Sequence, residues 1–262
     1  MRNAVFFDID GTLWDYSHDI LESTRQAICT LRANGHVAFL CSGRTRSTIR
    51  ARQLLDIGFD GILAGCGTYL ECEGKVLSEY VIPYEKLLDL TSRFQDSQMG
   101  VMYEGSNVLC VDRDYYKDDV YVMSFEQELG EQFIGLDELT PGHRVNKFCV
   151  DFARSDARRL IEILGTDYTA IFHTFGPVAE VIPAGFSKAT AIRDICDHFG
   201  IDRANTYAFG DSMNDLDMIR YAAHGVAMGN ADPRLKEAAD YVTKDLSDHG
   251  IYHALHYFSL IE

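Results

Sequence analysis

The chain has 262 residues, enough for one large domain or two modest ones with a substantial buried core. Its composition, 47% hydrophobic and 24% charged, is ordinary for a folded globular protein. The formal net charge of −16 argues against electrostatic binding to nucleic acid or to an anionic membrane, since binding to either requires a basic protein surface.

The cysteines and the N-terminus indicate a cytoplasmic protein. The seven cysteines are odd in number, form no C-x-x-C pair and in several cases lie inside apolar runs, a pattern typical of reduced, buried thiols. The apolar run at the N-terminus is too short for a secretory signal, and no apolar stretch approaches the length of a transmembrane helix.

Strand-like and helix-like segments alternate at the two ends of the chain. Short apolar runs predict parallel strands buried on both faces, and apolar residues at helical spacing predict the helices between them. The early segments are strand 4–7, helix 19–32, strand 36–41, helix 45–55 and strand 61–65. The late segments are helix 188–199, strand 206–210, helix 214–222, strand 224–228, helix 233–239 and strand 241–242. This alternation predicts an α/β fold, a Rossmann-like, doubly wound parallel sheet.

The middle of the chain follows a different order. Its segments are helix 84–94, strands 100–104 and 108–112, helix 116–129, strand 146–152, helix 156–165, and strands 168–174 and 178–182. This order predicts an α+β domain, an antiparallel sheet with helices on one face. Pro83 and Pro183, each preceded by isoleucine, mark the two boundaries between this middle domain and the rest of the chain. We therefore expect a core of residues 1–83 and 184–262 with an inserted cap of residues 84–183.

Polar residues follow the predicted core strands. Asp8 and Asp10 come after the first strand, Ser42-Gly43 after the second, and a Gly-Asp-Ser-Met-Asn-Asp run (210–215) after the fourth. Lys188 opens a helix, whose N-terminus also favours an anion. In open α/β sheets ligands bind beyond the carboxyl ends of the strands, so these residues are expected to meet. Carboxylates suit Mg²⁺, and a hydroxyl, glycine amides and a lysine suit a phosphate, which is the set that phosphoryl transfer requires.

These four motifs, in this order and at this spacing, resemble those of the haloacid dehalogenase superfamily. The motifs are Asp8-Ile9-Asp10-Gly11-Thr12-Leu13, Ser42, Lys188 and Gly210-Asp211-(x2)-Asn214-Asp215. The insertion between the second and third motifs resembles the large α/β cap of the superfamily's Cof-type sugar-phosphatase branch. The resemblance implies a Mg²⁺-dependent phosphatase acting on a small phosphorylated metabolite, in particular a sugar phosphate.

The resemblance also implies roles for the residues that carry the chemistry. Asp8 would be the nucleophile that forms a phospho-aspartate, and it would also bind Mg²⁺. Asp10 would be the general acid and then the general base, with its backbone carbonyl on the metal. Lys188 would neutralise the growing charge and pair with Asp8.

The remaining motif residues would hold the metal and the phosphate. Asp211 would be the second carboxylate on Mg²⁺. Ser42, the Gly43 amide and Asn214 would bind phosphoryl oxygens. Asp215 would orient Lys188 or a metal-bound water.

The motifs leave two alternative functions open. A phosphomutase keeps Asp10 as a phosphatase does, and a requirement for a bisphosphate activator would identify it. A non-catalytic, regulatory phosphate-binding protein is disfavoured because binding alone has no need of Asp10. The presence of Asp10 argues against a dehalogenase, in which this residue is lacking.

Two other clusters are weaker candidates. His249, His253 and His256 lie on one face of a possible helix, but no carboxylate stands at ligand spacing. The acidic run from Asp112 to Asp119 lacks the glycine and the final glutamate of a calcium loop, so a solvated turn is favoured.

Overall fold

The computed structural model describes residues 2–15, 19–173 and 176–262, and it divides them into two compact units. The first unit comprises Met1–Gly43, Arg50–Ser78 and Ser187–Glu262, and the second comprises Arg44–Ile49 and Glu79–Phe186. Within the described ranges, no helix is both long enough and apolar enough to span a membrane.

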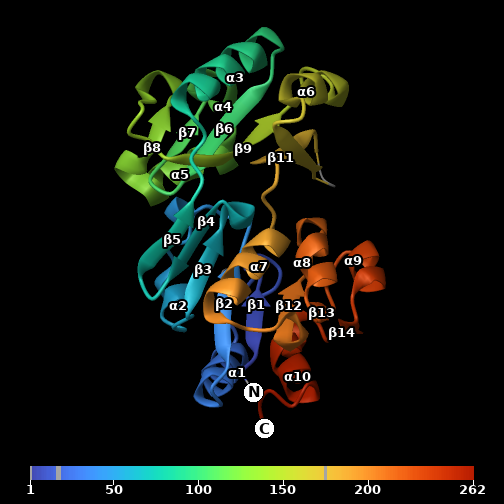
Figure 1. Cartoon of the computed structure of the whole chain (residues 1–262). Coiled ribbons are helices and arrows are strands. Elements are labelled where there is room, and N and C mark those ends of the chain that lie inside the picture. Colours follow the sequence, from blue (N-terminus) through green and yellow to red (C-terminus); the bar gives the residue numbers. More distant parts are fainter. Residues whose placement is uncertain (1, 16–18, 174–175) are drawn as a thin grey trace. The chain divides into compact units, whose positions relative to one another are not determined.

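The first unit is built on an eight-stranded sheet (Figure 1). Its strands, in sheet order, are β14 (Tyr241–Val242), β13 (His224–Ala227), β12 (Thr206–Gly210), β1 (Ala4–Phe7), β2 (Val37–Cys41), β3 (Gly61–Ala64), β4 (Tyr69–Cys72) and β5 (Lys75–Glu79). The six strands from β14 to β3 pair in parallel, and β4 pairs antiparallel to β3. The parallel α/β sheet expected from the sequence is therefore confirmed, whereas the β4–β5 extension was not predicted.

The central strands of this sheet are buried completely. Every residue of β1, β2 and β12 is buried, as their continuous apolar sequences require in a sheet covered on both faces. The helices of this unit are α1 (Glu22–Ala33), α2 (Arg52–Leu55), α7 (Lys188–Phe199), α8 (Leu216–Tyr221), α9 (Pro233–Ala238) and α10 (Gly250–Tyr257). Helix α7 and strand β12 have the bounds that the sequence predicts.

The prediction of a continuous helix over residues 45–55 is wrong. Residues 45–55 form a 3-10 turn (Arg46–Thr48) and the short α2, separated by non-helical backbone at Ile49 and Ala51. The Thr48 hydroxyl donates to the Thr45 carbonyl at 3.0 Å, a side-chain bond that competes with helix formation.

The second unit is built on a six-stranded sheet. In sheet order the strands are β10 (Tyr168–Phe172), β11 (Val178–Pro183), β9 (Val145–Asp151), β6 (Gly100–Gly105), β7 (Leu109–Val111) and β8 (Phe133–Gly135). All pairs are antiparallel except β7–β8, which is parallel. The helices are α3 (Tyr84–Asp96), α4 (Arg113–Tyr116), α5 (Val120–Leu129) and α6 (Ala157–Leu164). The predicted strand 168–174 ends in residue 174, which lies outside the described residues.

The helices of this unit do not all lie on one face, which corrects the prediction. Alternate residues of β7 point to opposite faces of the sheet. Cys110 of β7 and Val108, which directly precedes the strand, join the cluster formed with α3 and α6, whereas Leu109 and Val111 join a second cluster formed with α4 and α5. The predicted helix 116–129 begins too early, because Tyr116 is the last residue of α4 and the Asp119 carboxylate, which accepts the Val122 N–H at 3.0 Å, caps the start of α5.

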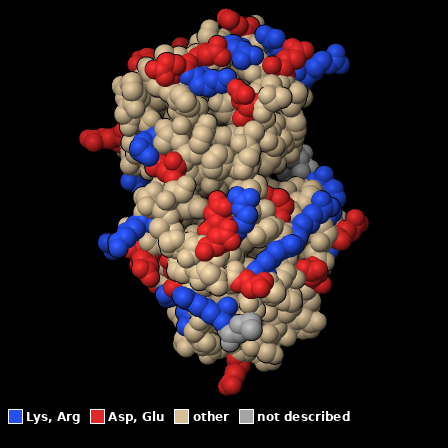
Figure 2. All heavy atoms as spheres, in the orientation of Figure 1, with Lys and Arg blue, Asp and Glu red and all other residues tan. Residues whose placement is uncertain are grey.

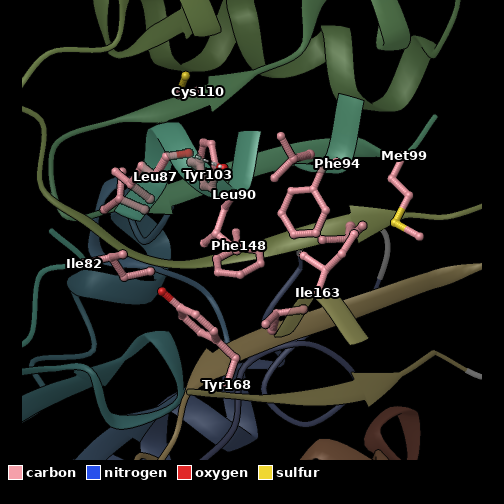
Figure 3. Close-up of a cluster of buried hydrophobic side chains, with 14 of the residues drawn as sticks. Ile82, Leu87, Leu90, Phe94, Met99, Tyr103, Cys110, Phe148, Ile163 and Tyr168 are labelled. Carbon is pink, nitrogen blue, oxygen red and sulfur yellow. Dashed lines mark hydrogen bonds between the residues drawn. The ribbon is translucent and has the colours of Figure 1, made fainter. Parts of the chain in front are cut away.

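The larger cluster centres on Phe148 of β9 (Figure 3). Its ring lies 5.2 Å from that of Tyr168, 5.7 Å from that of Tyr103 and 5.8 Å from that of Phe94. Leu87, Leu90 and Phe94 of α3 lie at helical spacing and present one apolar face to this cluster.

Helix α3 offers a matched test of this packing. Leu90 is fully buried, whereas Leu88 on the same helix is 47% exposed. We expect Leu90→Ala to lower the free energy of unfolding by about 2–5 kcal/mol, because it removes buried methyl groups and leaves a cavity. Leu88→Ala should change it by no more than about 0.5 kcal/mol. Urea unfolding followed by circular dichroism measures both, and equal effects would contradict this packing.

Candidate active site

Asp8 directly follows the central strand β1. Its N–H donates to the Phe209 carbonyl of β12 at 3.0 Å, which continues the parallel pairing of the two strands past the end of β1. The Asp8 residue is only 4% exposed. A carboxylate held this deeply needs cationic partners.

Lys188 supplies one of those partners. It is the first residue of α7, whose N-cap Ser187 accepts the Thr190 N–H in a capping box. Its Nζ lies 2.7 Å from Asp8 Oδ1 and 2.5 Å from Asp215 Oδ1. The Lys188 ammonium therefore joins two carboxylates that stand 180 and 27 residues away in the chain.

Asp215 is held by the turn that follows β12. Its Oδ2 accepts the N–H groups of Asp211 at 2.9 Å and Ser212 at 3.0 Å, while its Oδ1 accepts from Lys188. The residue is fully buried. Gly210 is required beside it, because a Cβ at position 210 would lie 2.6 Å from the Asp215 side chain. Asp215 thus links the turn to Lys188.

Asp211 faces the loop after β1. The Thr12 hydroxyl donates to Asp211 Oδ1 at 3.0 Å. Gly11 has a φ of +82°, and a Cβ there would lie 2.3 Å from Asp211 Oδ2, so the close approach of the two loops depends on glycine.

Three carboxylates form a candidate metal centre. One oxygen each of Asp8, Asp211 and Asp215 lies within 4.8 Å of the others, and no other such set of three or more possible ligand residues occurs in the part of the chain that the structure describes. One lysine among three carboxylates leaves negative charge uncompensated. An oxygen donor set with excess negative charge fits a hard divalent cation.

The pKa shifts follow from the same crowding. Burial, reinforced by the Asp215 charge, raises the pKa of Asp8 well above its usual value, although Lys188 opposes the shift. Burial and Asp215 likewise raise the pKa of Asp211 to about 7. Burial alone would lower the pKa of Lys188, but Asp215 and Asp8 outweigh it and raise that pKa well above its ordinary value. Lys188 therefore stays charged, and a divalent cation would favour ionised Asp8 and Asp211.

Ser42 and Gly43 follow β2, the neighbour of β1 in the sheet. Ser42 is 2% exposed, its N–H donates to the Leu63 carbonyl at 2.9 Å, and its carbonyl accepts the Cys66 N–H at 3.0 Å. Adjacent parallel strands thus place Ser42 at the same edge of the sheet as Asp8.

Asn214 lies in the turn after β12. Its side-chain oxygen accepts the Ser212 hydroxyl at 2.7 Å. This bond fixes the amide plane of Asn214 and leaves its NH₂ group, a donor suited to an anion, pointing away from Ser212.

Asp10 takes a different position from the other aspartates. Its side chain is exposed, and its Oδ1 accepts the indole N–H of Trp14 at 2.9 Å. The predicted contact of Asp10 with a metal is through its backbone carbonyl. Reasoning from the sequence assigned no role to Trp14 or to Thr12, because hydrogen bonds made by a turn leave no periodic signal.

Neither of the two weaker candidates belongs to a group of possible metal ligands among the residues that the structure describes. His249 precedes α10, and its Nδ1 lies 2.7 Å from the Ser23 hydroxyl. Asp112 and Asp119 are the N-caps of α4 and α5 and accept backbone N–H groups there. The acidic run is therefore a pair of helix starts.

Comparison with known proteins defines the class to which this site belongs. The family model of the haloacid dehalogenase-like hydrolases matches residues 5–255. YkrA of Bacillus subtilis, named as a candidate phosphatase, is 29% identical over 259 residues, 98% of each chain. The HMP-PP phosphatase of Cronobacter sakazakii is 31% identical over 239 residues, which are 87% of this chain and 85% of its own.

Solved structures agree with these sequence matches. The subclass IIB sugar phosphatase BT4131 superposes with a TM-score of 0.80 at 27% identity, covering 99% of this chain and 100% of its own. The phosphatase BT1666 from Bacteroides thetaiotaomicron superposes with a TM-score of 0.85 at 25% identity, covering 100% of this chain and 96% of its own. The protein is thus a hydrolase of the phosphatase type. It belongs to the haloacid dehalogenase-like hydrolase family.

Proposed function

We propose that this chain is a Mg²⁺-dependent phosphatase that removes phosphate from a small phosphorylated metabolite through a phospho-aspartate on Asp8. The observation that carries the proposal is the buried Lys188 ammonium, which bridges Asp8 and Asp215 beside Asp211. This arrangement holds a nucleophilic carboxylate, a fixed cation and a set of hard oxygen ligands at one edge of the sheet.

Asp8 would attack the phosphorus atom as the bond to the leaving oxygen breaks. Lys188 donates to Asp8 Oδ1 and would neutralise charge that grows on the phosphoryl oxygens. The second oxygen of Asp8 then serves as the nucleophile, so that the lysine also fixes which oxygen attacks.

Asp10 would give its proton to the leaving oxygen in the first step. In the second step it would take a proton from the water that attacks phosphorus, and the bond between phosphorus and Asp8 breaks to release phosphate. The exposure of Asp10 fits a group that exchanges protons with substrate and water.

Asp8, Asp211 and the backbone carbonyl of Asp10 would hold Mg²⁺, which when bound offsets the negative charge of the carboxylates and of the phosphate. Ser42, the Gly43 amide and Asn214 would bind the phosphoryl oxygens. Asp215 would hold Lys188 in place, as its hydrogen bonds to the turn after β12 support.

We also propose that the chain consists of a core of residues 1–83 and 184–262 and a cap of residues 84–183, with different functions. The core carries the chemistry, and the cap contributes to the choice of substrate.

A small metabolite such as a sugar phosphate is the proposed substrate class. The named activities of related proteins, a sugar phosphatase and an HMP-PP phosphatase, support it. Acidic and basic side chains are interspersed on the face shown in Figure 2, and the net charge of −16 disfavours a nucleic acid partner. A cytoplasmic location fits the seven free cysteines.

Metal removal tests the proposal. We expect the native protein to hydrolyse 4-nitrophenyl phosphate and members of a sugar phosphate panel with Mg²⁺, to lose turnover in EDTA and to regain it when Mg²⁺ is restored. Released orthophosphate is the readout. Turnover that persists after exhaustive chelation would contradict the metal requirement. Turnover only with a bisphosphate activator would indicate a mutase, and binding without turnover would indicate a regulatory protein.

A further inference from the structure

The side-chain amide of Asn230 joins two other segments of the first unit. Its Nδ2 donates to the Gly11 carbonyl at 2.8 Å, and its Oδ1 accepts the Leu246 N–H at 3.0 Å. One partner accepts and the other donates, so together they fix the orientation of the amide. Asn230 therefore holds the loop after β1 to a part of the unit that lies 219 residues later in the chain.

The turn that carries Asn230 is itself bound to the strand end that carries Asp211. This turn follows β13, the neighbour of β12 in the sheet. The Met228 N–H donates to the Gly210 carbonyl at 2.9 Å. The Asp232 N–H donates to the Asp211 carbonyl at 2.8 Å. Both ends of the turn are thus fixed to the backbone that carries the Asp211 carboxylate.

Gly11, the residue that Asn230 holds, packs directly against the Asp211 side chain. A Cβ at position 11 would overlap Asp211 Oδ2. The hydroxyl of the next residue, Thr12, donates to Asp211 Oδ1 at 3.0 Å. A shift of this loop would therefore release both oxygens of Asp211 from the contacts that place them near Asp8 and Asp215.

We propose that Asn230 is a positioning residue for the metal centre, which keeps Asp211 where it can bind Mg²⁺ together with Asp8. The contacts form a closed ring: Asn230 holds Gly11, Gly11 packs against the Asp211 side chain, and the Asp211 backbone holds the turn that carries Asn230. The clustered carboxylates repel one another before a cation binds. Contacts that hold Asp211 in place therefore reduce the cost of gathering the metal ligands. This inference rests on the metal requirement in the proposed function.

The first unit contains a matched control for the hydrogen bond to Gly11. Asn34 Nδ2 donates to the Leu260 carbonyl at 2.9 Å across 226 residues. Asn34 is exposed, as Asn230 is, and its bond has the same donor and the same kind of acceptor. Asn34 lies between α1 and β2, where β2 begins, and so at the opposite edge of the sheet from Asp8. Asn34→Ala therefore removes an equivalent bond far from the carboxylates.

Isothermal titration calorimetry of the metal-free protein with Mg²⁺ alone measures the effect without substrate or turnover. We expect Asn230→Ala to bind Mg²⁺ about tenfold more weakly than the native protein, and Asn34→Ala to bind it within about twofold of the native affinity. Asn230→Ser, whose side chain is too short to span both partners, should weaken binding as Asn230→Ala does. Melting in EDTA establishes that each variant is folded at the temperature of the titration. At saturating Mg²⁺ the kcat of Asn230→Ala should approach the native value, because the bound metal itself holds Asp211.

Native Mg²⁺ affinity in Asn230→Ala and Asn230→Ser, or an equal loss of affinity in Asn34→Ala, would overturn the proposal. The native protein is titrated with Mg²⁺ and assayed with 4-nitrophenyl phosphate first. A native protein that does not bind Mg²⁺, or that turns over equally well without it, would refute the proposed metal requirement and the role of Asn230 with it. A native protein that binds and requires Mg²⁺, followed by no selective effect at Asn230, would refute the positioning role alone.

Discussion

Asp8→Asn is expected to lower kcat by on the order of 10⁴-fold or more, because an amide cannot act as the nucleophile at phosphorus. The substitution keeps the shape of the side chain and removes one negative charge from a cluster that contains Asp211 and Asp215. Initial rates of orthophosphate release with saturating Mg²⁺ measure the effect.

The variant should lose activity without losing its fold. Burial and Asp215 raise the pKa of Asp8, so the ionised form is less favourable in the folded state than in the unfolded chain. A group with a raised pKa contributes stability at pH values below its usual pKa and loses it as the pH rises toward the folded value. At neutral pH without metal, Asp8→Asn should therefore melt no lower than the native protein. Asp194→Asn, at an aspartate whose side chain is 49% exposed and paired with Arg193, is the matched control and should remain active.

Lys188→Met is expected to reduce kcat by on the order of 10²–10³-fold, because it removes the fixed cation at the phosphoryl group. It should also destabilise the metal-free protein by about 3–5 kcal/mol, since Asp8 and Asp215 would lose the buried cation that joins them.

The loss of stability in Lys188→Met should depend on the metal. Mg²⁺ supplies positive charge to the same carboxylates, so it should raise the melting temperature of Lys188→Met more than that of the native protein. Thermal melting with Mg²⁺ or EDTA measures the difference. The control is Lys86→Met, at a lysine whose side chain is 37% exposed and pairs with Asp167 at 2.8 Å, for which we expect little change in either condition. An equal response of Lys188→Met and native protein to Mg²⁺ would contradict a shared metal and lysine site.

The convergence of the motif residues could be predicted because the geometry of a parallel sheet enforces it. Asp8 and Asp211 follow β1 and β12, which pair in register, and Lys188 begins a helix that the apolar spacing and Ser187 cap define. These are long-range consequences of local patterns, since the carboxyl ends of parallel strands meet at one edge.

The parts that could not be predicted depend on single hydrogen bonds. The Thr48 hydroxyl and the Asp119 carboxylate each end or restart a helix that the apolar spacing alone would continue. The bond from Trp14 to Asp10 arises from the shape of the turn between them, which no periodic pattern reveals. The sequence also did not show that helices cover both faces of β7. That arrangement depends on Leu109 and Val111 packing against α4 and α5.

Trapping the covalent intermediate tests the central claim most directly. The native protein is mixed with substrate and Mg²⁺, quenched in acid and reduced with borohydride, which converts an aspartyl phosphate to homoserine. We predict homoserine at position 8 in the N-terminal peptide, and none in Asp8→Asn. Release of phosphate by the native protein with unmodified Asp8 at every quench time, or homoserine at Asp10 instead, would contradict a phospho-aspartate on Asp8.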